Sequence, residues 1–438
     1  MKQRVILSLL TGLLMTGCNS PGSSGSAQQA AAKPEAMSAE VIFDWFKYAT
    51  PNNRPTAPAG EYANPVLPGF YPDPSITKKG DDYYLTTSSF SYTPGLPILH
   101  SKNLTDWKLV GYALDREEQM EFSGARISRG IFAPTIRYHD GLFYIITTSV
   151  DNGGNFIITA SDPAGPWSEP IWLPEVGGID PDIFFDDDGR VYITHNEAPP
   201  GEPLYNGHRA IWMWEYDPAA QKVLPDSRKL LVNGGVDISQ EPIWIEAPHI
   251  YKVNDWYYLS CAEGGTGPQH SQVVFRTRSL DKPFIPYENN PILTQRDLSW
   301  PRPNPVDTAG HADMIQTDAG EWWAVFLGTR PYENYLYNTG RDTFLLPVEW
   351  RNEWPHILPA KTPIPPTSPR PAGTSKQQGT DFYDWDDQFD GNSLSVRWQT
   401  PRDFDRHWVS VENGVLTMSP LENALYSKEM VSYVGSHQ

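Results

Sequence analysis

Apolar and polar residues follow one plan in five successive segments of the chain. Each segment opens with a short motif that ends in isoleucine, passes through a turn, and closes in a run of aromatic and apolar residues. The openings are Asp73-Pro-Ser-Ile76, Ala133-Pro-Thr-Ile136, Asp180-Pro-Asp-Ile183, Ala247-Pro-His-Ile250 and Ala312-Asp-Met-Ile315. The closing runs are GDDYYLTTSS, DGLFYIITTS, DGRVYITHN, NDWYYLSCAE and GEWWAVFLG. Turns rich in Asp, Asn and Gly before aromatic runs predict hairpins of β-strands.

The spacing of the segments predicts a repeat architecture. Successive openings are 47 to 67 residues apart, which is enough for several strands in each unit. Such a period is typical of propeller blades, so five openings predict an all-β protein with a five-bladed β-propeller. A helical solenoid is not expected, because no window keeps a 3.6-residue apolar period for long. The 42 prolines and 34 glycines also favour many short strands and turns.

The regions on either side of the repeats differ in composition. We predict a signal peptide at 1–17, a lipoprotein tether and linker at 18–58, the propeller at 59–360, a proline-rich linker at 361–380, and part of a β-sandwich domain at 381–438. The segment AEVIFDWFKYA is expected to form a short helix against the main domain. Strand and turn signals continue to the last residues, so the final domain is expected to be truncated.

The N-terminus combines a positive start, an apolar stretch and a cysteine. Met15-Thr16-Gly17-Cys18 resembles a bacterial lipobox, which implies cleavage before Cys18 and lipidation of its sulfur. Asn19, in place of Asp, points by the usual sorting convention to the outer membrane, on its periplasmic or its surface side. An ordinary secretory signal with an incidental cysteine is the alternative. The second cysteine, Cys261, lies in an apolar run and is predicted to be a small core residue.

Charge and aromatic content narrow the range of partners. The formal net charge of −19 argues against nucleic acid, because no basic patch balances the acidic residues. Aromatic residues make up 13% of the chain. Exposed aromatic surface binds flat or amphipathic faces, sugars included, although a β-rich core explains much of this content as well.

Acidic residues occur where the five openings are expected to meet. The first strand of each propeller blade lines the axis, so Asp73, Asp180, Glu246 and His311 should converge at one mouth of the channel. Burial and like-charge repulsion must raise the pKa of at least one carboxyl in such a pocket. A carboxyl with a raised pKa donates a proton at neutral pH and an ordinary one accepts a proton. Glycoside hydrolysis requires this division of labour.

Each candidate also has a structural interpretation. An Asp before Pro commonly starts a turn, so Asp73 alone is a weak signal, whereas Glu246 between apolar residues has little structural reason to be there. His311 is a ligand-binding donor, a metal ligand or a core group. Other positions are expected to be structural, namely Asp182 and 186–188 in turns or solvent and His249 in the core. The sequence contains no P-loop, no G-x-S-x-G elbow and no cysteine–histidine cluster with zinc spacing.

Several motifs, in order, resemble one known family. NPVLPGFYPDPSI, FAPTIRYHDGLFYI, GGIDPDIFFDDDGRVYITH, EAPHIYK, AEGGTG and GHADMIQTDAGEWWAVFLGTRP, within residues 60–360, resemble glycoside hydrolase family 43, most of all its β-xylosidase and α-L-arabinofuranosidase members. The resemblance implies a five-bladed propeller and single-displacement, inverting hydrolysis. It implies that Asp73 is the general base, Glu246 the general acid, and Asp180 the carboxylate that orients and tunes the acid.

The resemblance also implies residues that contact the sugar. Phe90 and Phe132 match aromatic walls of the first subsite, and Phe132 replaces a residue that is often Trp. Arg330 matches an arginine aimed at sugar hydroxyls, with a surface ion pair as the alternative. No cofactor is expected to be required, although some members hold a calcium ion near the histidine that matches His311. The C-terminal segment resembles a β-sandwich that can close one side of the pocket.

These expectations favour an exo-acting hydrolase that releases xylose, arabinose or both from xylan- or arabinoxylan-derived oligosaccharides. β-Xylosidase and α-L-arabinofuranosidase are near rivals, because the two pentoses present similar sets of hydroxyls. The second hypothesis is a non-catalytic, carbohydrate-binding propeller lipoprotein. A third is a fructan-cleaving enzyme on a related propeller, which would retain configuration. The membrane is expected to be a partner through the lipid anchor at Cys18, and the sequence does not predict an oligomeric state.

Overall fold

The computed structural model describes residues 39–49, 56–333, 335–374, 383–425, 427–428, 430–431 and 433–436. In these residues the secondary structure is β-strand apart from one short 3-10 helix, η1 (Ile238–Gln240), so the all-β prediction is confirmed. No helix in the described part of the chain is long and apolar enough to cross a membrane. The predicted signal peptide and Cys18 lie outside the described residues.

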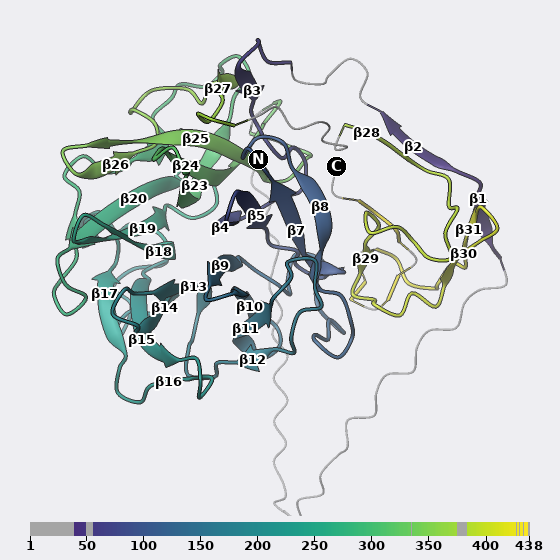
Figure 1. Cartoon of the computed structure of the whole chain (residues 1–438), viewed down its shortest axis with the longest axis horizontal. Helices are drawn as coiled ribbons and strands as arrows, with labels where there is room; N and C mark the ends of the chain where they lie inside the picture. Colours follow the sequence, from purple (N-terminus) through teal and green to yellow (C-terminus); the bar gives the residue numbers. More distant parts are fainter. Residues whose placement is uncertain are drawn as a thin grey trace, which may run out of the picture. The chain divides into compact units, whose positions relative to one another are not determined.

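Strands β4 to β26, apart from β6, form five antiparallel sheets that follow one another along the chain (Figure 1). The first sheet contains β4 (Ser75–Lys79), β5 (Asp82–Thr86), β7 (Gly95–Ser101) and β8 (Lys108–Leu114). The second contains β9 (Thr135–His139), β10 (Leu142–Ser149), β11 (Gly154–Ala160) and β12 (Ile171–Trp172). The third contains β13 (Ile179–Phe185), β14 (Val191–Glu197), β15 (Ala210–Asp217), β16 (Lys222–Val223) and β17 (Lys229–Asn233).

The last two sheets have the same plan. The fourth contains β18 (Glu246–Val253), β19 (Trp256–Glu263), β20 (Ser271–Thr277), β21 (Ile285–Pro286) and β22 (Leu293–Thr294). The fifth contains β23 (Asp307–Gln316), β24 (Trp322–Thr329), β25 (Asp342–Arg351) and β26 (Trp354–His356). Figure 1 shows the first strand of every sheet near the middle of the five. The five sequence openings lead into or lie within these first strands, and the five closing runs form the strands that pair with them.

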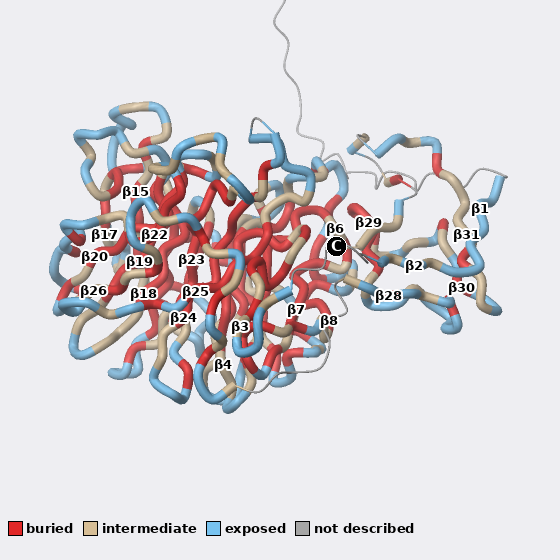
Figure 2. The backbone as a smooth tube through the Cα atoms, turned by 90° about the horizontal axis from the view of Figure 1, so that it is seen from above, coloured by how far each residue is buried: buried red, intermediate tan, exposed pale blue. Residues whose placement is uncertain are grey.

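The core lies between neighbouring sheets, where five apolar clusters each join two of them. Leu85 and Leu99 of the first sheet share one cluster with Val325 and Leu345 of the fifth, so packing runs right around the set. Burying one such side chain contributes about 1.5–3 kcal/mol. Figure 2 shows buried residues concentrated in these strands. Cys261 is buried and free in one of the clusters, as predicted.

The two ends of the repeat region are tied together. β3 (Glu61–Ala63) pairs with β27 (Thr367–Pro369), so part of the segment predicted as a linker forms a strand. Tyr62 Oη and Asn64 Nδ2 both donate to the carbonyl oxygen of Leu345, at 2.6 and 2.9 Å. These contacts hold the N-terminal end of the repeats against the last sheet.

The predicted helix in AEVIFDWFKYA is wrong. These residues form β1 (Val41–Phe43) and β2 (Phe46–Ala49), which pair with β31 (Val415–Met418) and β28 (Asp384–Asp387). β31 also pairs with β30 (Val409–Glu412). Val, Ile, Phe and Tyr favour strands when partners are present, but these partners lie more than 300 residues later in the sequence.

The C-terminal segment contacts the first sheet near Phe90. β29 (Thr400–Pro401) pairs with β6 (Tyr92–Thr93). Thr93 Oγ1 donates to the carbonyl oxygen of Asp403 at 2.6 Å, and the rings of Phe122 and Phe404 stack at 6.0 Å. The loop that follows Phe90 is therefore held by residues from the C-terminal segment.

A partly buried arginine, whose side chain is 18% exposed, connects the first strands of all five sheets. Arg137 of β9 donates to Asp313 of β23 (Nη1–Oδ2, 2.7 Å) and lies 3.0 Å from Asp182 of β13 (Nη2–Oδ1). Its Nη2 also lies 3.1 Å from Nδ1 of His249 on β18, and Ser75 of β4 donates to Asp313 Oδ2 at 2.6 Å. We call these five residues the axial network. Burial opposes the charge of Arg137, but Asp182 and Asp313 outweigh it and raise the pKa of the guanidinium.

Two carboxylates expected in turns or solvent are buried instead. Asp182 belongs to the axial network, and Asp186 accepts from Lys252 Nζ at 2.6 Å and from Tyr257 Oη at 2.7 Å. Their partners come from other strands, so the local sequence does not show them.

We predict that Arg137→Met lowers the free energy of unfolding by about 3–5 kcal/mol, because it leaves two buried carboxylates without a counterion. Equilibrium unfolding in guanidinium chloride measures the change. Arg190→Met is the matched control, since Arg190 is an exposed partner of Asp188 and its loss should cost under about 0.5 kcal/mol. A loss below about 1 kcal/mol for Arg137→Met would show that the axial network does not hold the sheets together.

Candidate functional site

In three of the five sheets the first strand begins with irregular backbone, which sets the direction of the candidate side chains. The pairing register shifts between Ile179 and Asp182 in β13, between Glu246 and His249 in β18, and between Gly310 and Asp313 in β23. A bulge of this kind bends the strand and redirects a side chain. Asp180, Glu246 and His311 lie in or beside these shifts, so they leave the regular alternation of the sheet.

The same positions adopt left-handed backbone conformations. Asp73, Asp180, Ala247 and His311 have φ values of 55°, 54°, 49° and 55°. Such conformations cost a non-glycine residue about 1–3 kcal/mol each and persist where the surroundings enforce them. Gly178 supports the third strand, because a Cβ there would lie 1.7 Å from the carbonyl oxygen of Asn196. Three of the five openings therefore carry strain at their first residue, and a fourth carries it at the residue just before its opening.

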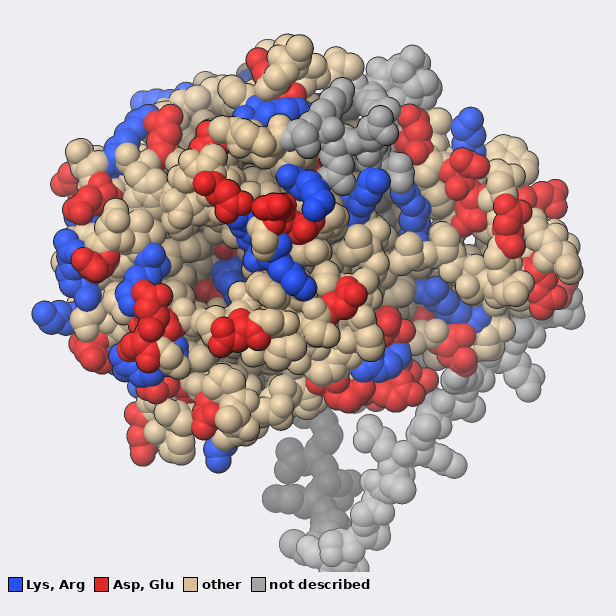
Figure 3. All heavy atoms as spheres, viewed as in Figure 1, with Lys and Arg blue, Asp and Glu red and all other residues tan. Residues whose placement is uncertain are grey.

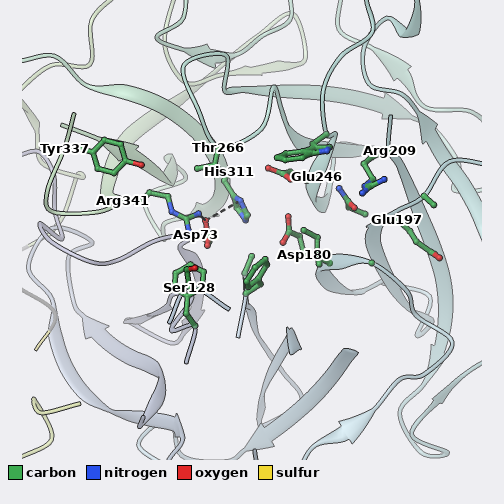
Figure 4. Close-up of a pocket in the computed structure, with 18 residues that line it drawn as sticks. Asp73, Ser128, Asp180, Glu197, Arg209, Glu246, Thr266, His311, Tyr337 and Arg341 are labelled. Carbon is green, nitrogen blue, oxygen red and sulfur yellow. Dashed lines mark hydrogen bonds and ion pairs between the residues drawn. The ribbon is translucent and has the colours of Figure 1, made fainter. Parts of the chain in front are cut away.

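The four side chains predicted to converge do line one pocket, of about 650 Å³ (Figure 4). This volume is typical of small-molecule sites. Figure 3 shows a hollow at the middle of the five sheets with acidic and basic side chains inside it. Beside Asp73, Asp180, Glu246 and His311, the lining includes Phe90, Ser128, Phe132, Asn196, Glu197, Arg209, Trp244, Thr266, Tyr337 and Arg341.

Asp73 is held as a carboxylate. Arg341 Nη1 donates to its Oδ1 at 2.5 Å, and Ser88 Oγ donates to its Oδ2 at 2.5 Å. Burial alone would raise the pKa of Asp73, but Arg341, His311 and Ser88 outweigh it and lower the pKa below its ordinary value. An ionised, oriented carboxylate can accept a proton.

Glu246 and Asp180 are shifted in the opposite direction. Burial, followed by the charges of Asp180 and Asp73, raises the pKa of Glu246 well above its ordinary value. Burial and the charge of Asp73 raise the pKa of Asp180 to about 7, although the N–H of Ala247 donates to it. One pocket thus holds a carboxylate and a protonated carboxyl at the same pH.

His311 is a neutral imidazole beside Asp73. Burial lowers the pKa of His311 to about 3, despite a separation of only 3.8 Å between its Nδ1 and Asp73 Oδ1. Calcium takes six to eight oxygen ligands. The described residues contain no cluster of three or more His, Cys, Asp or Glu suited to a metal. The side chains around His311 therefore do not fit a calcium ion held by protein ligands.

The aromatic residues predicted for the sugar site form one face of the pocket. The rings of Phe90 and Phe132 meet edge to face at 5.6 Å, and Phe70 packs on Phe90 at 5.6 Å. The guanidinium of Arg341 lies 5.5 Å from the centre of the Phe90 ring. An aromatic surface next to a fixed cation suits the apolar face and the hydroxyls of a sugar.

The structure does not bring Arg330 into the pocket lining. Its Nε and Nη2 donate to Asp342 Oδ2 and Oδ1 at 2.8 and 2.9 Å, which is the ion-pair alternative. Arg341 lies in the pocket instead, and its carbonyl accepts from the N–H of Tyr71 at 3.0 Å. The sequence offered one signal for Arg341, a cation directly before the third strand of the last repeat.

The predicted sandwich does not contribute to the pocket in the described residues. All lining residues come from positions 73 to 341. The C-terminal segment instead supports the loop after Phe90 through β29.

The chain belongs to glycosyl hydrolases family 43, whose family model matches residues 62–355. It is 48% identical over 298 residues to a xylosidase/arabinosidase of Butyrivibrio fibrisolvens, and 41% identical over 303 residues to a non-reducing end alpha-L-arabinofuranosidase of Bacteroides ovatus. Each match covers 68% of this chain but only 56% and 53% of the relative, so the chain spans about half the length of these proteins.

Solved structures show the same relationship. A GH43_12 protein retrieved from a capybara gut metagenome superposes with a TM-score of 0.83 at 40% identity, over 93% of this chain and 76% of that one. A xylan beta-1,4-xylosidase from Bacillus halodurans gives a TM-score of 0.72 at 33% identity, over 86% of this chain and 72% of that one.

We predict that Asp180→Asn stabilises the protein at pH 8 but has little effect at pH 4. An acid whose pKa is raised from 3.8 to about 7 in the folded state opposes folding increasingly as pH rises between those values. Asn keeps an acceptor for Ala247 without the charge, so the gain at pH 8 should be about 1–4 kcal/mol. Thermal unfolding at both pH values measures it. An equal effect at the two pH values would show that the charge of Asp180 is not the cause.

Proposed function

We propose that this protein is an exo-acting, inverting glycoside hydrolase that releases xylose, arabinose or both from xylan- or arabinoxylan-derived oligosaccharides. The observation that carries the proposal is the opposite shift of two carboxyl pKa values in one pocket, down for Asp73 and up for Glu246. The relatives' printed activities support the choice of pentose substrates.

In this proposal Glu246 donates its proton to the glycosidic oxygen as the bond to the anomeric carbon breaks. Asp73 takes a proton from the water that attacks the anomeric carbon from the opposite face, which inverts the configuration. Asp180 raises the pKa of Glu246 through its charge and accepts from the backbone next to Glu246, so it tunes and positions the acid. Arg341 holds Asp73 ionised and points at the same sugar.

The other lining residues bind the ring. Phe90 and Phe132 supply the aromatic face, and neutral His311 is a hydrogen-bonding group for a sugar hydroxyl. We also propose that the five sheets are the blades of a five-bladed β-propeller and that β28 to β31 belong to a β-sandwich. The ring of apolar clusters and the axial network support the first of these two proposals.

β-Xylosidase is our first choice of activity, and α-L-arabinofuranosidase is the second candidate. The Butyrivibrio fibrisolvens relative carries both names at 48% identity, and the relatives named for a single activity match at 41% (arabinofuranosidase) and 33% (xylosidase). Assays of the nitrophenyl β-xyloside and α-L-arabinofuranoside side by side distinguish the two.

We predict that Glu246→Gln lowers kcat for an oligosaccharide by about 10²–10⁴-fold, because the leaving oxygen then departs without a proton. The loss should be smaller for a nitrophenyl glycoside, whose leaving group needs less help. Glu263→Gln is the matched control, since Glu263 is a buried carboxyl outside the pocket lining. Unchanged sugar release by Glu246→Gln would remove the acid from this role, and a first product of retained configuration in NMR would remove the inverting mechanism.

We further propose that Cys18 is lipidated and anchors the protein in the outer membrane. Cys18→Ala should abolish incorporation of labelled palmitate and shift the protein out of the membrane fraction. Cys261→Ala is the control, because the chain has two cysteines and Cys261 is buried. Label retained in Cys18→Ala would contradict the anchor.

A further inference from the structure

The proposed chemistry assigns a direction to the pocket. Water attacks from the side of Asp73, and the leaving oxygen must lie on the side of Glu246. Figure 4 shows Asp73 and Arg341 on one side, Asp180 and Glu246 in the middle, and Arg209 and Glu197 beyond Glu246. The residues beyond Glu246 therefore face whatever departs when the bond breaks.

We propose that Arg209, with Trp244, forms a binding site for the leaving-group saccharide, so that the protein selects substrates by the sugar behind the scissile bond. This inference rests on the proposed function, because the direction of the pocket comes from the roles of Asp73 and Glu246. The chemical class of ligand is a neutral saccharide that offers neighbouring hydroxyls to a guanidinium.

Two arginines line the pocket, and Arg209 is the one whose N–H groups are not paired with a carboxylate among the described residues. Arg341 is bound to Asp73, whereas Arg209 has no carboxylate within ion-pair distance among the described residues. Its recorded side-chain hydrogen bond is a long one, from Nη1 to the carbonyl oxygen of His208 at 3.4 Å. A guanidinium carries five N–H donors in a rigid fork, which matches two adjacent hydroxyls of a sugar.

The neighbouring carboxylate does not use these donors. Glu197 is paired with Arg228 at 2.5 Å, and the guanidinium of Arg228 stacks on Trp212 at 3.9 Å. The acid on this wall is therefore already neutralised, and Arg209 is left facing the cavity.

Trp244 supplies an aromatic surface next to Arg209. It lines the pocket two residues before Glu246 and is 45% exposed, which is unusual for so large an apolar side chain. Gly265 allows the indole to lie where it does, because a Cβ there would come within 3.0 Å of the ring. An exposed indole face suits the apolar face of a sugar ring.

The backbone holds the two residues in one rigid wall. The N–H of Trp244 donates to the carbonyl oxygen of Gly207 at 2.9 Å, and the N–H of Gly234 donates to that of Arg209 at 3.0 Å. Tyr205 Oη donates to the carbonyl oxygen of Pro242 at 3.0 Å. The wall is thus fixed before a ligand arrives.

The test compares kcat/KM for an oligosaccharide and a nitrophenyl glycoside of the same pentose. Arg209→Ala should lower the oligosaccharide-to-nitrophenyl ratio by about 10- to 100-fold, the effect of losing a charged hydrogen bond that only the saccharide makes. Trp244→Ala should raise KM for both substrates, because both leaving groups have a ring that can stack. Arg190→Ala is the matched control and should leave the ratio unchanged.

Three outcomes would overturn the proposal. An unchanged ratio in Arg209→Ala would show that the arginine faces solvent. In Arg209→Ala, kcat/KM could fall equally for both substrates while the decline of activity at high pH shifts to another pH. That result would show that Arg209 acts on Glu246 and not on the saccharide. If the unaltered protein released no pentose from either substrate, the proposed function would fail first and this inference with it.

Discussion

The contact between Arg137 and the carboxylates of Asp182 and Asp313 is the constraint on which the rest depends. It joins strands β9, β13 and β23 at the middle of the five sheets, and Ser75 and His249 bring in the remaining two first strands. Ser75, Asp182, His249 and Asp313 follow Asp73, Asp180, Glu246 and His311 by only two or three residues in the sequence. The positions of the pocket residues are therefore fixed by buried charges one layer below them.

The pocket itself is costly to maintain. Left-handed backbone at Asp73, Asp180, Ala247 and His311, together with three acids in one cavity, opposes folding. That cost has a chemical consequence, because Arg341 is ion-paired with Asp73, whereas Asp180 and Glu246 have no ion-pair partner among the described residues and are affected only by the more distant charges of Arg341 and Arg209. Because only Asp73 among Asp73, Asp180 and Glu246 has a close counterion, the pKa values that a proton donor and a proton acceptor need are separated.

The sequence was most informative where the signal was repeated. Five similar openings placed Asp73, Asp180, Glu246 and His311 at equivalent points, and the structure brings them into one pocket. The resemblance to known motifs added Phe90 and Phe132, which also line it. Glu246 could be ranked from its surroundings, because a lone acid among apolar residues is expensive without a role, whereas the role of Asp180 came mainly from the resemblance.

Features that depend on distant partners could not be predicted. β1 and β2 pair with strands from the other end of the chain, so a local apolar run was misread as a helix. Arg330 and Arg341 both lie in the last repeat. Only the fold shows that Arg330 pairs with Asp342 and that Arg341 pairs with Asp73. The sequence likewise could not show that the N–H groups of Arg209 have no carboxylate partner among the described residues, because that depends on which acids lie near it in the fold.

The central claim is that one pocket holds an ionised Asp73 opposite a protonated Glu246. Neutron diffraction from deuterium-exchanged crystals at pH 6 would locate the protons on both carboxyls directly. A deuteron on Glu246 and none on Asp73 is the predicted result. A deuteron on Asp73, or a bare carboxylate at Glu246, would contradict the assignment of donor and acceptor on which the proposed chemistry rests.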